Sequence, residues 1–176
     1  MNQIIYPDDF SNFKIGEKYP VLKADNSITI SNAALSLLSQ ARHSVDIFTH
    51  DLESRILDTP EIVAAITGFI KISPKSRLKI LLCDPSVPVK KGHRFIELSR
   101  KLSSFISIRK THEEYQTKAF CFIIVDGKAM IFRPYADEYS AIINFDAAYE
   151  SRQHLEFFNE VWELSEPASE LRQLYI

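Results

Sequence analysis

Hydrophobic and polar positions along the chain follow two periods, one typical of helices and one typical of strands. Apolar residues recur at helical spacing after Ser31, after Pro60 and between Gly92 and Leu102. Strand-like runs follow these segments, at residues 44–49, 77–83 and 105–109. Helix and strand thus alternate three times, an order that predicts a parallel sheet covered by helices.

The helix after Pro60 has the clearest start in the sequence. Asp58 or Thr59 can cap it, Pro60 suits the first helical position and Glu61 suits the first turn. Ser31 is the candidate cap of the preceding helix. We therefore expect both segments to cover the sheet.

The alternation of helix and strand ends near residue 118. Asp126-Gly127 is a strong signal for a two-residue turn, which joins a strand at 119–125 to one at 128–132. We expect a further strand at 140–145, a helix at 147–164 that Asp146 can cap, and a short packed helical turn in the tail. These elements predict the α/β class, with a mixed, mostly parallel sheet flanked by helices on both faces.

The 176 residues suit one domain with a sizeable core. Residues 1–27 show no clear period and contain Pro7, Gly16 and Pro20, so we expect an irregular N-terminal arm lying on one domain at 28–176. No apolar run approaches the roughly 20 residues of a membrane-spanning helix, and no leader pattern is visible. The expectation is a cytoplasmic protein that does not associate with membranes.

The two cysteines, Cys83 and Cys121, lie inside apolar strand patterns. Buried, reduced thiols account for both. Neither has a second Cys or His at ligand spacing, so we expect no metal site and no cofactor.

Charge is distributed unevenly along the chain. Residues 71–118 hold 12 Lys and Arg against 4 Asp and Glu, or +8, while the remainder holds 9 against 19, or −10, which sums to the net −2. This asymmetry indicates either an anion-binding face, a basic face that docks on an acidic one, or a solvated mixed surface.

The order and spacing of these segments resemble the phospholipase D-like fold. The stretch SNAALSLLSQARHSVDIFTHDL is similar to that family's entry helix and strand, RLKILLCD is similar to the next strand, and residues 119–132 are similar to its catalytic hairpin. The stretch GHRFIELSRKLSSFISIRK is closer to an uncharacterised proteobacterial branch, a domain of unknown function often attached behind an acetyltransferase of the GNAT type. The resemblance implies a bacterial protein, and a homodimer, because single-motif members pair two copies to complete one site.

Active members of that family carry His-x-Lys, then Asp, and a Gly-Ser-x-Asn segment beyond the hairpin. Aligning Asp126 with the Asp places Ala119 at the His position and Cys121 at the Lys position. Aligning Lys118 with the Lys places Gln116 at the His position instead. Neither register contains the nucleophilic histidine, so the resemblance implies a degenerate site; whether the chain is an enzyme stays open, with the balance toward a non-catalytic protein.

Several polar residues are candidates for binding an anion. Lys90, Lys91, His93 and Arg94 gather at an expected helix start, where an anion or an acidic partner would be favourable, although a solvated turn also explains them.

Three further candidates lie near expected strand ends. Arg133 either holds an anion or fills the vacated pocket by pairing with Asp126 or Asp84. Asp126 suits the turn itself, and His50 follows a strand on the side where ligand sites gather in α/β proteins.

The pattern as a whole favours a non-catalytic phospholipase D-like binding or assembly module, which forms a homodimer or binds an anionic ligand or a protein. A phosphodiesterase or nuclease with a rebuilt site that uses His93, His50 or Cys121 is a competing hypothesis. A nucleic-acid-binding protein and a regulatory domain for an acetyltransferase are also compatible with the pattern.

Overall fold

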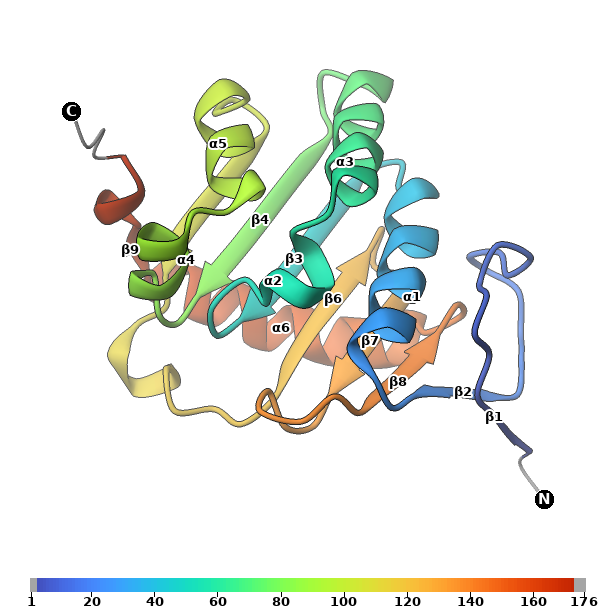
Figure 1. The fold of residues 1–176 in the computed structure, drawn as a ribbon. Coiled ribbons are helices and arrows are strands. Elements are labelled where there is room, and N and C mark those ends of the chain that lie inside the picture. Colours follow the sequence, from blue (N-terminus) through green and yellow to red (C-terminus); the bar gives the residue numbers. More distant parts are fainter. Residues whose placement is uncertain (1–2, 173–176) are drawn as a thin grey trace.

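The computed structural model describes residues 3–172, which form a nine-stranded sheet with helices on both faces (Figure 1). In chain order the strands are β1 (Ile4–Ile5), β2 (Val21–Ala24), β3 (Ser44–Thr49), β4 (Arg77–Leu82), β5 (Ile106–Lys110), β6 (Cys121–Val125), β7 (Ala129–Arg133), β8 (Ala141–Asn144) and β9 (Glu166–Pro167). The helices are α1 (Ser27–Ser39), α2 (Ser54–Leu57), α3 (Pro60–Ile72), α4 (Ser86–Lys91), α5 (Arg94–Lys101) and α6 (Ala148–Leu164), with short 3-10 turns η1 (Glu113–Tyr115) and η2 (Ser169–Leu171).

The sheet order is β1-β2-β8-β7-β6-β3-β4-β5-β9. The neighbours β1–β2, β3–β4 and β4–β5 run parallel, and the other five pairs run antiparallel. The predicted mixed α/β sheet is confirmed, but the sheet is not mostly parallel: the parallel pairs are β1–β2 at one end and β3–β4 and β4–β5 toward the other. The reason is that neighbouring strands are joined by helical crossovers only from β3 to β5, whereas β6, β7 and β8 follow one another as antiparallel hairpins.

Helices divide unequally between the two faces, as Figure 1 shows with α6 behind the sheet. Alternate strand residues therefore enter different cores: Val45 and Ile47 of β3 pack beneath α1 and α3, while Phe48 packs with Phe158 and Trp162 of α6. Among the helices of residues 3–172, none is long and apolar enough to cross a membrane.

Helix α3 begins where the sequence predicts, with the side chain of Thr59 accepting a hydrogen bond from the backbone N–H of Ile62. Helix α1 begins earlier than expected, because Asn26 and not Ser31 caps it by accepting from Thr29 N at 2.9 Å. Asp146 does not cap α6, which starts after Ala147 without a side-chain cap.

The two ends of the chain are built into the sheet more than the sequence suggests. The expected irregular arm contains β1 and β2, and β2 pairs with β8, while Phe10 is 1% exposed in the core. At the other end β9 pairs with β5 before η2 begins. Of the predicted packed tail, residues 173–176 lie outside the described part of the chain.

Candidate functional site

Several strand termini meet at one edge of the sheet, which we call the carboxyl edge. Strands β3, β4 and β5 end there, and because β6 runs antiparallel to β3 and to β7, β6 begins there and β7 ends there. The carboxyl ends of parallel strands are where ligands bind in α/β sheets. Ala119, Cys121 and Arg133, the positions singled out by the resemblance, all come from this edge.

Arg133, the last residue of β7, is a buried cation at the carboxyl edge. It is 3% exposed and its Nη1 forms an ion pair with Oε1 of Glu53. Its Nη2 donates to the carbonyl oxygens of Ala136 at 2.9 Å and Glu138 at 2.6 Å, and its guanidinium lies 5.5 Å from the ring centre of Tyr139. Burial lowers the pKa of Arg133, but its partners keep the charge compensated.

Cys121 lies across the β6–β7 ladder from Arg133, with its Sγ 3.8 Å from Oε2 of Glu53. Burial raises the pKa of the Cys121 thiol to about 12, so the thiolate that a nucleophile requires does not form at neutral pH. Ala119 has no group that can attack or transfer a proton. Arg133, Glu53 and Cys121 therefore form a packed, charge-paired plug, whereas Ala119 is exposed.

The backbone that carries Glu53 is strained. Leu52 and Glu53 have φ angles of +64° and +40°, in the left-handed region that residues other than glycine rarely adopt. Neighbouring groups hold this conformation: Leu52 N donates to Oγ1 of Thr49 and Glu53 N donates to Oδ1 of Asp51. Both residues are held in the conformation that directs Glu53 toward Arg133.

Asp126 lies at the far end of the hairpin from Arg133, so the expected pairing between them is wrong. Its carboxylate accepts hydrogen bonds from the backbone N–H groups of Arg42, His43 and Ser44, at 2.9, 2.6 and 2.9 Å. Asp84, the other expected partner, accepts from the N–H and hydroxyl of Ser86. Asp126 therefore fastens the hairpin to the turn before β3, and Glu53 is the partner that the sequence did not reveal.

The predicted KKGHR cluster separates into different environments. His93 is 5% exposed, its Nδ1 accepts from Phe95 N and its Nε2 donates to the carbonyl of Leu52, at 3.1 Å each. Burial lowers the pKa of His93, which favours this neutral, α5-capping form. Arg94 pairs with Asp58 at 3.0 Å, whereas Lys91 is exposed at the end of α4.

A hollow of about 510 Å³ opens beside the plug, where β3, β4 and β5 end. We call it the carboxyl-edge pocket, and its lining residues are His50, Cys83, Asp84, Pro85, Ser86, Val89, Lys90, Lys110, Gln116 and Glu170. It brings together His50 and Lys90 of the predicted candidates, but not His93, Arg94, Asp126 or Arg133.

Lys110 and Glu170 are pocket residues that the sequence reasoning missed, although Lys110 could have been found from its place at the end of β5. Their side chains form an ion pair at 3.3 Å. Nε2 of His50 lies 2.7 Å from the carbonyl oxygen of Lys118. Because a carbonyl only accepts, Nε2 of His50 carries a proton in this contact.

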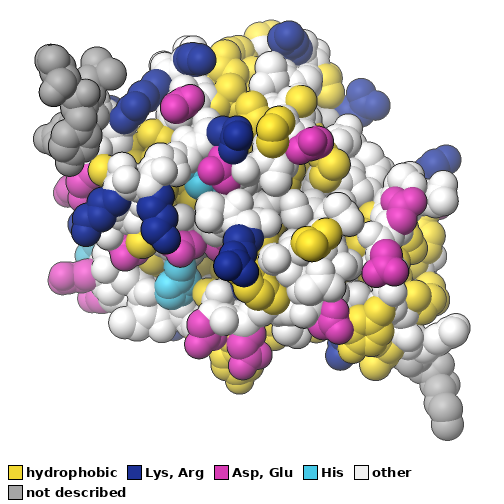
Figure 2. Space-filling model, in the orientation of Figure 1, with side chains coloured by type: hydrophobic (Ala, Val, Ile, Leu, Met, Phe, Trp, Pro, Cys, Tyr) yellow, Lys and Arg dark blue, Asp and Glu magenta, His cyan; other side chains and the backbone are white. Residues whose placement is uncertain are grey.

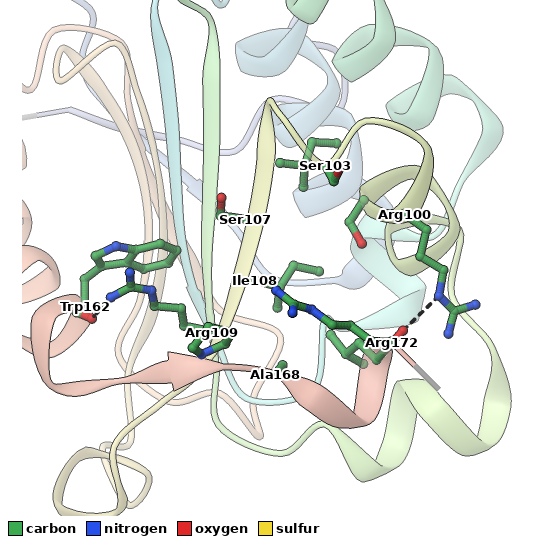
Figure 3. Close-up of a pocket in the computed structure, with 12 residues that line it drawn as sticks. Arg100, Ser103, Ser107, Ile108, Arg109, Trp162, Ala168 and Arg172 are labelled. Carbon is green, nitrogen blue, oxygen red and sulfur yellow. Dashed lines mark hydrogen bonds between the residues drawn. The ribbon is translucent and has the colours of Figure 1, made fainter. Parts of the chain in front are cut away.

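A second hollow, of about 540 Å³, lies at the β5–β9 edge (Figure 3). The guanidinium of Arg109 lies 4.5 Å from the indole centre of Trp162 and donates to the Trp162 carbonyl at 2.6 Å. Nε of Arg100 donates to the carbonyl of Leu171 at 2.8 Å. These contacts fasten β9 and η2 to the rest of the domain. Within residues 3–172, no group of three or more His, Cys, Asp or Glu side chains is placed to hold a metal ion.

One known family matches most of this chain. The family model for a domain of unknown function, DUF7931, matches residues 26–174. The chain belongs to the DUF7931 family. No curated protein matches it.

Solved structures show that this DUF7931 chain has the phospholipase D-like fold. The phospholipase D family member Nuc from Salmonella typhimurium is 16% identical with a TM-score of 0.56, over 76% of this chain and 87% of Nuc. NucT from Helicobacter pylori is 13% identical with a TM-score of 0.51, over 78% and 90%.

The fold also occurs within longer proteins. The archaeal chromatin protein TrmBL2 is 16% identical with a TM-score of 0.59, over 84% of this chain and 54% of TrmBL2. The DUF7931 chain therefore spans about half of TrmBL2. These identities establish the common fold and leave the function to be argued from the site.

Proposed function

We propose that this protein is a non-catalytic phospholipase D-like binding module, whose ligand site is the carboxyl-edge pocket. The observation that carries the proposal is the ion pair of Arg133 with Glu53, which lies beside Cys121, a position that the resemblance aligns with the catalytic Lys of the fold. A phosphoryl group would have to displace a buried, compensated cation to reach Cys121, which is itself buried. The open pocket next to the plug offers a ligand charged and polar groups without that displacement.

The chemistry of the remaining candidates supports a binding role. Covalent catalysis needs an activated nucleophile within reach of a base. Burial raises the pKa of Cys83 in the pocket to about 11, so it is protonated at neutral pH. His50 can orient or transfer a proton, but it has no activated thiolate beside it.

Turnover of a phosphodiester tests the proposal directly. We expect the purified protein to hydrolyse bis(p-nitrophenyl) phosphate no faster than buffer does. Hydrolysis that disappears in His50→Ala but persists in His43→Ala, an exposed histidine on the turn before β3, would overturn it in favour of a rebuilt phosphodiesterase. Mass photometry on the same sample tests the homodimer, which remains a prediction.

Binding of nucleic acid is a second candidate. Lys and Arg side chains gather over α4 and α5, on the left of Figure 2. TrmBL2, whose structure is described as showing a novel mode of DNA binding, uses the same fold. Duplex DNA affinity that falls steeply with added salt, and that weakens in Lys91→Gln/Lys101→Gln but not in Lys14→Gln/Lys18→Gln, would favour this function. Affinity that is equal in both double variants would reject it.

A further inference from the structure

The carboxyl-edge pocket carries both signs of charge in equal number. Lys90 and Lys110 contribute two positive charges, and Asp84 and Glu170 contribute two negative charges. His50 and Gln116 add neutral donors and acceptors. Since the formal charge of the lining is zero when His50 is neutral, the pocket has no overall preference for an anion or a cation.

The charged groups are available to a ligand in different degrees. Within residues 3–172, the ammonium of Lys90 has no hydrogen-bonding or ion-pair partner. Oδ1 of Asp84 accepts from Ser86 N at 2.9 Å and from Ser86 Oγ at 2.6 Å, which leaves Oδ2 unoccupied in the described structure. These two groups, one of each sign, can bind a ligand without breaking an existing contact.

The other two charges neutralise each other weakly. The side chains of Lys110 and Glu170 are 46% and 45% exposed, and exposed pairs of this kind contribute only ~0–1 kcal/mol. A ligand can therefore recruit either partner with little loss of stability. Hydrogen bonds from Ser86, and then the charges of Lys90 and Lys110, lower the pKa of Asp84, so its carboxylate is ionised at neutral pH.

From this arrangement we infer that the carboxyl-edge pocket binds a small zwitterion, a molecule with one ammonium group and one phosphate or carboxylate group. The ammonium group binds Asp84 and the anionic group binds Lys90, with Lys110 in support. The inference rests on the proposed binding function and narrows its ligand. A purely anionic ligand meets the same lysines but is repelled by Asp84 and Glu170, whereas a zwitterion compensates both signs. The volume of about 510 Å³ suits a small molecule.

A matched pair of ligands separates the two charges. We would titrate the full chain by calorimetry with 2-aminoethyl phosphate and with ethyl phosphate, which lacks the ammonium group. We expect 2-aminoethyl phosphate to bind about tenfold more tightly, a difference of about 1.4 kcal/mol. Lys90→Gln should weaken both ligands.

Asp84→Asn gives the decisive comparison, because asparagine keeps an oxygen that can accept from Ser86. We expect this variant to bind 2-aminoethyl phosphate about five- to tenfold more weakly, while ethyl phosphate binds equally well or more tightly. Asp137→Asn, an exposed carboxylate in the β7–β8 loop, is the matched control and should change neither. Circular dichroism checks that each variant is folded.

The outcomes distinguish this inference from the proposed function. If both ligands bind equally and Asp84→Asn strengthens both, the zwitterion inference fails and the pocket is an anion site. If neither ligand binds to any folded variant, the carboxyl-edge pocket is not a small-ligand site and the proposed function loses its ligand site as well.

Discussion

The guanidinium of Arg133 and the carboxylate of Glu53 form an ion pair at the carboxyl edge of the sheet. The arginine comes from the end of β7 and the glutamate from the strained backbone after β3. The two side chains therefore form a charge-compensated pair within the packed part of the domain.

Removing one partner should leave an uncompensated buried charge. We expect Glu53→Ala to lower the free energy of unfolding by about 3–5 kcal/mol, because Arg133 would remain desolvated without its carboxylate. Denaturation in urea, followed by tryptophan fluorescence, measures this change.

Two further variants test whether the lost ion pair causes the destabilisation of Glu53→Ala. Glu138→Ala removes an exposed carboxylate from the adjacent loop and should change stability by less than about 0.5 kcal/mol. Arg133→Met/Glu53→Leu replaces both charges by apolar groups and should recover most of the loss. Equal stability of Glu53→Ala and Glu138→Ala would show that the ion pair is not what holds Arg133.

Local signals in the sequence predicted the elements whose starts and turns depend on neighbouring residues. Thr59 and Pro60 set the start of α3, and Asp126-Gly127 sets the hairpin, in which both residues have positive φ angles. The crossover order from α1 to β5 was also predicted correctly, and with it the fold class.

The plug and the pocket depend on contacts between distant residues, which no local pattern contains. Glu53 and Arg133 are 80 positions apart, and their pairing requires left-handed conformations that are unusual for Leu52 and Glu53. His93 belongs to a polar run, yet Gly92, with φ of +76°, turns the chain so that the imidazole is buried as a cap. Only tertiary structure places Glu170 beside Lys110.

The carboxylate of Asp126 should stabilise the fold through its hydrogen bonds to the turn before β3. We expect Asp126→Gly, which keeps a residue that tolerates positive φ, to lower the free energy of unfolding by about 2–3 kcal/mol through loss of three charged hydrogen bonds. Asp126→Asn retains an acceptor and should lose about half as much. A loss below about 0.5 kcal/mol in Asp126→Gly, measured by the same urea denaturation, would contradict the fastening role.

Both thiols should be inert in the folded protein. Burial raises the pKa of Cys83 to about 11 and that of Cys121 to about 12, so native protein treated with iodoacetamide near neutral pH should stay unlabelled. The same treatment in guanidinium chloride should add two carbamidomethyl groups by mass spectrometry, one at each free cysteine. Rapid labelling of native Cys121, absent in Cys121→Ser, would restore it as a candidate nucleophile.

Asp46 should make stability depend on pH. Its side chain lies on β3 opposite Lys79 of β4, and burial raises its pKa from 3.8 to about 6, an effect that Lys79 opposes. The folded state therefore holds the proton more tightly than the unfolded state. Its contribution to stability is fully present below pH 3.8 and is lost as the pH rises through about 6.

Asp46→Asn removes this titration. We expect the variant to gain stability relative to the natural protein as pH rises, reaching a difference of about 2–3 kcal/mol at neutral pH, since each unit of pKa corresponds to about 1.4 kcal/mol. Urea denaturation of both proteins at several pH values measures the difference, with Asp137→Asn as the exposed control. Lys79→Met should move the transition to higher pH, because it removes the cation that favours ionised Asp46. Parallel stability curves for Asp46→Asn and the natural protein would show that Asp46 ionises equally in the folded and unfolded chains.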